Sequence, residues 1–225
     1  MQLVIGNKNY SSWSMRPWVL MRQLGLPFDE LKLRFDAAPD SAFSRAVAKV
    51  SPAGRVPVLV DDGFSVWDTL AIVEYLHERH PGRGIWPAAP RERARARSLA
   101  AEMHAGFGAL RSRCPMNIEA ALGEVGARLW VEQADLRADV ARIESMWAQA
   151  LTASGGPFLF GAFGAVDAYY APVCMRFRTY ALPLGDTARA YADRVAAAPG
   201  VAAWIADALA EQDFLDFEEP YRSSR

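Results

Sequence analysis

The hydroxyl groups with the clearest chemical context lie near the start of the chain, in Asn-Lys-Asn-Tyr-Ser-Ser-Trp-Ser-Met-Arg-Pro-Trp at residues 7–18. Ser11, Ser12 and Ser14 precede Pro17, which fits an early helical turn because its missing N–H does no harm there. A helix N-terminus presents unpaired N–H groups and about half a positive charge, so a nearby hydroxyl completes a site for an anion. The alternative is that Ser12 or Ser14 only caps the helix, and the two interpretations are compatible.

A second stretch with chemical meaning is Arg55-Val56-Pro57. Pro57 pushes Val56 towards extended geometry and can take the cis bond that only X-Pro reaches at low energy. A cis bond would leave the backbone N–H and C=O of Val56 free to pair with an extended peptide ligand, as in edge-strand addition. The alternative is an ordinary proline at the start of a strand.

Asp68 and Thr69 precede Leu-Ala-Ile-Val-Glu-Tyr-Leu and mark a second helix start. The N–H groups and the Thr69 hydroxyl could hold a carboxylate while Asp68 holds an amine. Taken alone, the pair is an N-cap.

Other reactive patterns are weak. His77 and His80 are three residues apart near a helix end, a spacing that could begin a metal site, but no further distinctive ligands accompany them and we expect no metal. No Gly-x-Ser-x-Gly elbow surrounds Ser11, so a hydrolase nucleophile is not indicated. Cys114 and Cys174 are widely separated, which favours reduced thiols over a disulfide framework or a zinc cluster.

The composition is that of a globular protein of one large or two small domains: 225 residues, 52% hydrophobic and 23% charged. With 25 basic and 26 acidic residues the net charge is −1, so no global field favours nucleic acid or an anionic membrane. No apolar run approaches the roughly 20 residues that a bilayer requires, and the start lacks a basic signal region. We therefore expect a cytoplasmic protein.

The elements that position these residues fall into two groups separated by a Pro- and Gly-rich linker at 81–90. Before it, residues 1–80 predict a βαβαββα domain with a mixed sheet. The expected elements are a strand at 3–5, helix 15–24, strand 31–35, helix 41–49, a strand pair at 56–60 and 64–67 joined by an Asp-Asp-Gly hairpin, and a helix from 68.

After the linker, residues 91–225 predict an all-helical domain. A core stripe recurs at helical spacing, and it consists of Leu122, Val125, Leu129, Leu136, Val140, Ile143, Trp147 and Leu151. Further helices are expected at 91–113, 165–180, 186–197 and 201–211.

The motifs at 10–16, 52–57 and 68–76 resemble, in order and spacing, the glutathione-contacting stretches of the glutathione S-transferases. A fourth, Phe163-Gly164-x-x-Asp167, is similar to the capping motif at a core helix of that family's all-helical domain. The resemblance covers nearly the whole chain and is strongest to serine-type, zeta-like and related bacterial members. It implies a thioredoxin-like first domain, a helical second domain and a two-fold homodimer.

The resemblance also implies roles for individual residues. Ser11 would hydrogen-bond the glutathione sulfur, with Ser12 as the alternative. The residues expected around the rest of glutathione are Ser14, Arg55, Val56, Pro57, Asp68 and Thr69. The residues expected to line an acceptor pocket are Tyr10, Trp13, Met103, His104, Phe107 and Arg111, with Asn117 nearby; the alternative for those after residue 100 is a core or dimer contact. By their charge alone, Arg176 and Arg178 could favour an acidic acceptor, and the alternative is that they form surface or interface pairs.

The implied activity is transfer of glutathione, as a co-substrate without a metal, to a small alkyl or aryl electrophile, as in detoxification. Trp13 replaces the cysteine that zeta-like members often carry, and Gly164 replaces the usual Ser or Thr cap. The alternatives are a glutathione-dependent isomerase of the maleylacetoacetate type, a dehalogenase, or a non-catalytic glutathione-binding module with the same fold.

Overall fold

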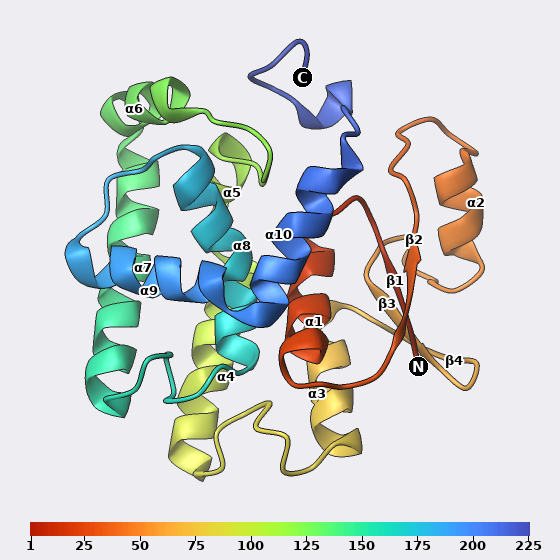
Figure 1. The fold of residues 1–225 in the computed structure, drawn as a ribbon, viewed down its shortest axis with the longest axis horizontal. Helices are drawn as coiled ribbons and strands as arrows, with labels where there is room; N and C mark the ends of the chain where they lie inside the picture. Colours follow the sequence, from red (N-terminus) through yellow and green to blue (C-terminus); the bar gives the residue numbers. More distant parts are fainter.

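A computed structural model describes residues 1–225. It places a four-stranded sheet and its helices beside a larger group of helices (Figure 1). The strands are β1 (Gln2–Ile5), β2 (Asp29–Lys32), β3 (Val58–Asp61) and β4 (Phe64–Trp67). Their order is β2-β1-β3-β4, with β1 parallel to β2 and antiparallel to β3.

Three helices accompany the sheet: α1 (Ser12–Gln23), α2 (Ala42–Ala48) and α3 (Thr69–Arg79). α1 and α3 lie between the sheet and the helical domain, and α2 lies on the opposite side (Figure 1). The predicted βαβαββα order is therefore confirmed. The β3–β4 hairpin turns at Asp62 and Gly63, both with positive φ, as the Asp-Gly pair predicts.

The helical domain contains α4 (Pro90–Ala105), α5 (Gly108–Arg113), α6 (Gly123–Glu132), α7 (Ala134–Ser154), α8 (Ala165–Thr179), α9 (Asp186–Ala197), α10 (Pro199–Glu211) and a 3₁₀ turn, η1 (Asp216–Glu218). α8 forms its centre, because nearly every residue from Ala165 to Thr179 is buried. The helices predicted at 165–180, 186–197 and 201–211 are present, the last beginning two residues earlier.

Four predicted elements differ from those in the structure. The helix predicted at 91–113 is two helices, because Phe107 adopts a left-handed backbone conformation between α4 and α5. The apolar stripe from Leu122 to Leu151 also spans two helices, with a break at Gln133, although most of its members are buried as expected.

The strand predicted at 31–35 lies at Asp29–Lys32. It pairs with β1, whose four residues lie opposite these four, from Gln2 opposite Asp29 to Ile5 opposite Lys32. α1 begins at Ser12, before the predicted Met15, so Pro17 is inside the helix rather than in its first turn.

The sheet domain meets the helical domain along α1, which packs against α8 and α10. Gly200 allows the closest approach: a Cβ there would lie 2.7 Å from the backbone oxygen of Val19. The Gly200 N–H also donates to the side chain of Gln23 at 2.9 Å. The helix that carries the serine residues is therefore fixed between the sheet and the helical domain.

No helix has both the length and the apolar character needed to cross a membrane.

Candidate active site

Ser11 is the N-cap of α1, and its hydroxyl oxygen accepts a hydrogen bond from the Ser14 N–H at 3.3 Å. The two hydroxyl oxygens are 2.7 Å apart, and that of Ser14 also accepts from the Gly6 N–H at 3.2 Å. Ser14 is fully buried, so it lies behind Ser11 and has no surface to offer a ligand. The alternative that Ser12 or Ser14 caps the helix is therefore wrong, because the cap is Ser11, the residue expected to contact the sulfur.

The N-terminus of α1 opens into a pocket of about 370 Å³ where the two domains meet. From the sheet domain it is lined by Tyr10, Ser11, Ser12, Trp13, Phe35, Phe43, Gly54, Arg55 and Val56. From the helical domain it is lined by Arg111, Pro115, Met116, Arg176 and Glu218. The structure thus brings the first two predicted motifs together in one pocket.

Val56 lies at the edge of this pocket, before a cis bond to Pro57. Neither its N–H nor its C=O makes a backbone hydrogen bond within the chain. Both groups are therefore available to a ligand, and of the two alternatives for Pro57 the structure has the cis bond.

Asp68 and Thr69 lie outside the lining of this pocket. Asp68 caps α3 by accepting from the Leu70 N–H at 2.8 Å and is exposed, whereas Thr69 is buried. His104 connects them to the pocket: its ring lies 3.4 Å from a carboxylate oxygen of Asp68, 3.4 Å from the Thr69 hydroxyl, and edge-on to Trp13. Burial, together with Arg16 and other cations, holds the pKa of His104 below its usual value, against the opposing effect of Asp68.

The predicted acceptor residues divide into two groups. Tyr10, Trp13 and Arg111 line the pocket, whereas Met103 and Phe107 are buried in the core. Asn117 is also buried, where its side chain joins Asn9 to Glu219.

Three arginines surround Trp13 and Ser12. The Arg16 guanidinium lies 4.1 Å from the centre of the Trp13 ring, and that of Arg111 lies 4.9 Å from it. Arg176 donates to the Ser12 hydroxyl at 3.2 Å and to the carbonyl of Cys114. Arg178, two residues further along α8, is exposed and lies outside the pocket lining.

Two of these arginines are buried without a carboxylate partner. Arg16 is 1% exposed and its Nε and Nη1 have no hydrogen-bond partner, and the Nε of Arg176 also has none. Burial, with the neighbouring arginines, lowers the pKa of Arg16 to about 9 and that of Arg176 to about 10. Both therefore remain charged at neutral pH, and Arg176 contributes its positive charge to the pocket lining.

The protein's own thiols lie outside this arrangement. Both cysteines are buried, and burial raises the pKa of Cys114 to about 12. A sulfur nucleophile in the pocket must therefore come from a ligand. No group of three or more His, Cys, Asp or Glu side chains is placed to hold a metal ion.

The loop that follows β1 is held in place by acidic side chains of α10. The Lys8 N–H donates to Glu211 at 2.7 Å, and the Lys8 ammonium pairs with Asp207 at 2.6 Å and Glu30 at 2.7 Å. The Asn9 N–H donates to the other oxygen of Glu211 at 3.2 Å. The position of Ser11 thus depends on residues about 200 positions away in the sequence.

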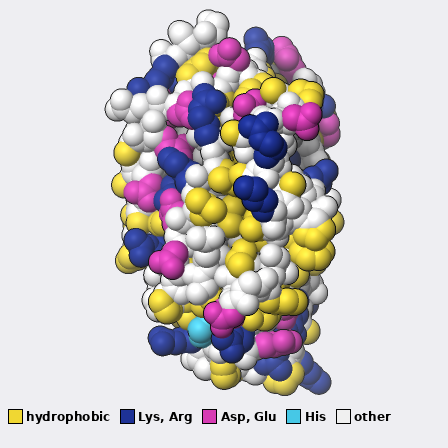
Figure 2. Space-filling view, turned by 90° about the vertical axis from the view of Figure 1, so that its right-hand side faces the viewer, with side chains coloured by type: hydrophobic (Ala, Val, Ile, Leu, Met, Phe, Trp, Pro, Cys, Tyr) yellow, Lys and Arg dark blue, Asp and Glu magenta, His cyan; other side chains and the backbone are white.

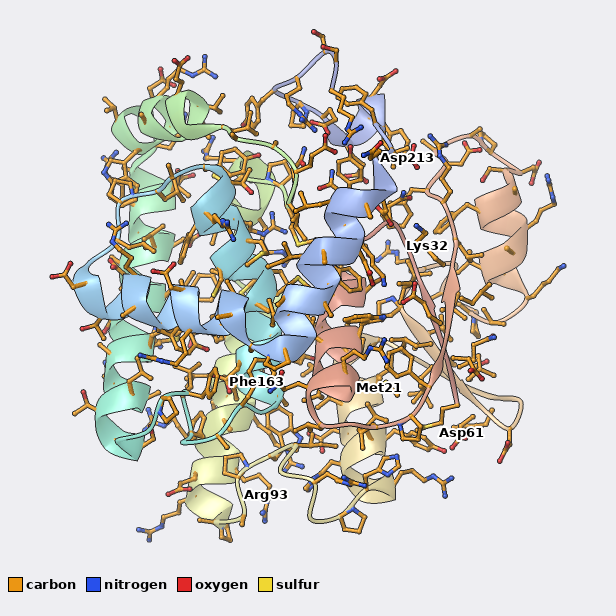
Figure 3. All side chains as sticks on the ribbon, in the orientation of Figure 1. Met21, Lys32, Asp61, Arg93, Phe163 and Asp213 are labelled. Carbon is orange, nitrogen blue, oxygen red and sulfur yellow. The ribbon has the colours of Figure 1, made fainter.

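The same segment is joined to the strand side of the sheet. Lys32 pairs with Glu211 at 3.0 Å, and Arg34 makes two hydrogen bonds to Asp213 at 2.8 and 2.9 Å. Figure 3 labels Lys32 on β2 and Asp213 just beyond α10, on facing sides of this junction. Sequence reasoning missed these contacts, because no local pattern indicates where the chain after α10 returns.

The fold and the pocket define a two-domain protein in which a thioredoxin-like sheet domain and a helical domain form one site where they meet. Residues 10–79 match the family described as glutathione S-transferase, N-terminal domain, and residues 88–207 match glutathione S-transferase, C-terminal domain. The chain belongs to the glutathione S-transferase family.

Similar proteins include two relatives named as isomerases. A probable maleylacetoacetate isomerase of Caenorhabditis elegans is 29% identical over 43% of this chain and 42% of its own length. The maleylacetoacetate isomerase of Pseudomonas aeruginosa is 29% identical over 58% of this chain and 62% of its own. The chain thus matches less than two thirds of the length of either relative.

Among solved structures, a glutathione transferase homologue from Burkholderia with bound glutathione superposes with a TM-score of 0.69, covering 92% of this chain and 97% of the other at 22% identity. This similarity establishes the fold.

Proposed function

We propose that the protein binds glutathione at the N-terminus of α1, residues 1–80 forming the glutathione-binding domain and residues 91–225 completing an acceptor pocket across the linker at 81–90. The observation that carries the proposal is Ser11, an N-cap hydroxyl that lines a pocket between the domains. A free thiol has a pKa of about 8.5, and lowering it by about two requires roughly 2.7 kcal/mol of preferential stabilisation of the thiolate. A helix N-terminus supplies about 0.3–2 kcal/mol and a hydrogen bond to an anion about 1.5–3 kcal/mol, so no general base is required.

Ser14 supports Ser11 from behind. Because each hydroxyl can both donate and accept, Ser14 can donate to Ser11 while its oxygen still accepts from the Gly6 N–H. The Ser11 O–H is then free to donate to sulfur. Ser12 stays the alternative, since its oxygen accepts from Arg176 and leaves its own O–H unassigned.

The rest of the peptide has suitable partners. The free N–H and C=O of Val56 would pair with the cysteinyl unit, and the exposed Arg55 would meet the glycyl carboxylate. Asp68 would receive the amine of the γ-glutamyl end. Because the Thr69 hydroxyl already accepts from Tyr169 at 3.0 Å, we expect Thr69 to contribute mainly its backbone N–H to the γ-glutamyl carboxylate.

We propose an unsaturated carboxylic acid as the class of acceptor, because Arg111 and Arg176 line the pocket. The thiolate forms a C–S bond at the β-carbon, and the π electrons move towards the activating carbonyl group. Protonation of the α-carbon gives a glutathione conjugate. If the α-carbon is not protonated, rotation about the former C=C bond of the enolate, followed by return of its electrons and loss of the thiolate, gives the geometric isomer and regenerates the glutathione thiolate. Addition of the thiolate is the first step of both conjugation and isomerisation. The similarity to relatives named as isomerases favours testing isomerisation.

The experiment titrates the ultraviolet absorbance of the thiolate of glutathione with and without protein, then identifies products from unsaturated acids by mass spectrometry and chromatography. If the pKa of the bound thiol is lowered and the product is a glutathione conjugate, the result supports transfer. If the pKa is lowered and the product is the isomerised acid, the result supports isomerisation. Binding without a lowered pKa would make the protein a non-catalytic module, and no binding would reject the proposal.

Replacement of Arg111 by glutamine is expected to raise the KM for a carboxylate acceptor about 10-fold, because a hydrogen-bonded charge at a partly buried site contributes about 1.5–3 kcal/mol. The KM for glutathione should stay the same. Arg113→Gln is the matched control on the same helix, since Arg113 pairs with Asp135 outside the pocket. Equal effects of both variants would contradict the assigned role of Arg111.

We expect the protein to form a two-fold homodimer that uses the exposed face of β4. Phe64 is 62% exposed there. Figure 2 views the molecule from the sheet side and shows hydrophobic side chains across the middle of that side. Phe64→Ser should weaken the dimer at least about 100-fold, because a two-fold contact uses the residue twice at roughly 1.5–3 kcal/mol each. Light scattering across a dilution series measures this. Phe217→Ser, at another exposed aromatic, should leave the dimer intact.

A further inference from the structure

The chain after α10 returns to the pocket and is firmly anchored there. The Tyr10 hydroxyl donates to Glu219 at 2.7 Å and accepts from the Leu215 N–H at 3.3 Å. Glu219 also accepts from Asn117 at 2.8 Å and pairs with Arg222. These contacts fix the position of η1 relative to Tyr10, which itself lines the pocket.

Glu218 is the acidic residue that this segment contributes to the pocket lining. It is partly buried, and its side chain makes no hydrogen bond or ion pair, although Arg111 and Arg176 line the same pocket. Burial and the adjacent Glu219 raise the pKa of its carboxyl group, while Arg176 opposes this effect. The pocket therefore holds one unpaired carboxyl group among its arginines.

We propose that Glu218 is a specificity-determining residue that selects acceptors by charge, by weakening the binding of molecules that carry more than one carboxylate. This inference builds on the acidic acceptor proposed above. With Glu218 ionised, the lining that the helical domain contributes, Arg111, Arg176 and Glu218, sums to one positive charge, which a single carboxylate neutralises. Arg55 adds its charge from the sheet domain, where the glycyl carboxylate of glutathione is proposed to bind. A second carboxylate in the pocket meets repulsion from Glu218.

The test uses three unsaturated molecules of similar shape: crotonamide, crotonate and fumarate, with no, one and two carboxylates. Their dissociation constants are measured by calorimetry on the full chain without glutathione. Glu218→Gln should tighten fumarate about 3- to 10-fold, as expected for one charge removed at a partly screened distance, tighten crotonate less, and leave crotonamide unchanged. The gain for fumarate should shrink at high salt.

Two further variants provide controls. Asp216→Asn removes a charge from the same 3₁₀ turn at an exposed position outside the pocket lining, and it should change none of the three constants. Glu218→Asp keeps the charge and should preserve the wild-type order. Equal changes for all three ligands, a matching effect of Asp216→Asn, or no binding of fumarate to either form would overturn the proposal.

The same measurements separate this inference from the glutathione proposal. Charge-ordered changes in a protein that does not bind glutathione would support Glu218 and reject the thiolate function. If the wild-type protein stabilises the thiolate but Glu218→Gln binds the acids unchanged, the thiolate function is supported and the role of Glu218 is rejected.

Discussion

Replacement of Ser11 by alanine is expected to lower the ratio of thiolate to thiol for bound glutathione about 10- to 100-fold. The hydroxyl is the N-cap of α1 and lines the pocket, and a hydrogen bond to an anion contributes about 1.5–3 kcal/mol. The turnover rate should fall with the thiolate fraction, because the thiolate is the nucleophile. With a wild-type thiol pKa lowered to about 6.5, that is roughly 3- to 25-fold at pH 7. Ultraviolet titration of the bound thiol measures the effect directly.

The control must separate loss of sulfur stabilisation from loss of a helix cap, which by itself destabilises a protein by about 1 kcal/mol. Ser41 provides it: its hydroxyl caps α2 and accepts from the Ser44 N–H at 3.1 Å, as Ser11 does for Ser14. Ser41→Ala should reduce stability without raising the thiol pKa. A large rise in Ser12→Ala with none in Ser11→Ala would transfer the role to Ser12.

Replacement of Asp167 by alanine is expected to lower the free energy of unfolding by about 3–5 kcal/mol. The buried carboxylate accepts from the Gly164 N–H at 2.9 Å, the Leu159 N–H at 3.1 Å and the Tyr191 hydroxyl at 2.8 Å. Each donor left without a partner in the interior costs about 1–3 kcal/mol. Denaturant unfolding measures the loss. Asp186→Ala, at the exposed start of α9, should cost less than about 1 kcal/mol.

Asp167 should also make stability depend on pH. Burial raises its pKa to about 6 from an ordinary value of 3.8, so the folded protein holds this proton more tightly than the unfolded chain. The resulting stabilisation is present below about pH 4 and is lost as the pH rises through about 6. The unfolding free energy of wild type relative to Asp167→Asn should therefore fall by up to about 3 kcal/mol across this interval. A flat difference would show that the folded carboxyl keeps its ordinary pKa.

Local chemistry accounts for the parts of the fold that could be predicted. Asp62-Gly63 selects the hairpin turn, and the prolines at 81–90 separate the two groups of elements. The order of the motifs identified the family, and the first helix start and Val56 lie together as expected.

The features that could not be predicted from the sequence depend on tertiary contacts. The helical spacing of the apolar residues continues on both sides of Gln133, so it could not reveal the break between α6 and α7. Arg16 matched a motif, but its burial between Trp13 and Tyr169 depends on how α1 packs against α8. Glu218 could not be predicted as a pocket residue, because its place follows from the path of the chain after α10.

The hydrogen bond from the Lys8 N–H to Glu211 joins residues 203 positions apart. During translation the serine-bearing loop leaves the ribosome long before its acidic partners exist. We expect the sheet to form early with this loop still loose, so that the pocket acquires its shape only when synthesis has passed η1. A nascent or prematurely terminated chain would then be folded in part yet unable to hold a reactive sulfur, which would keep reactive chemistry from starting on unfinished protein.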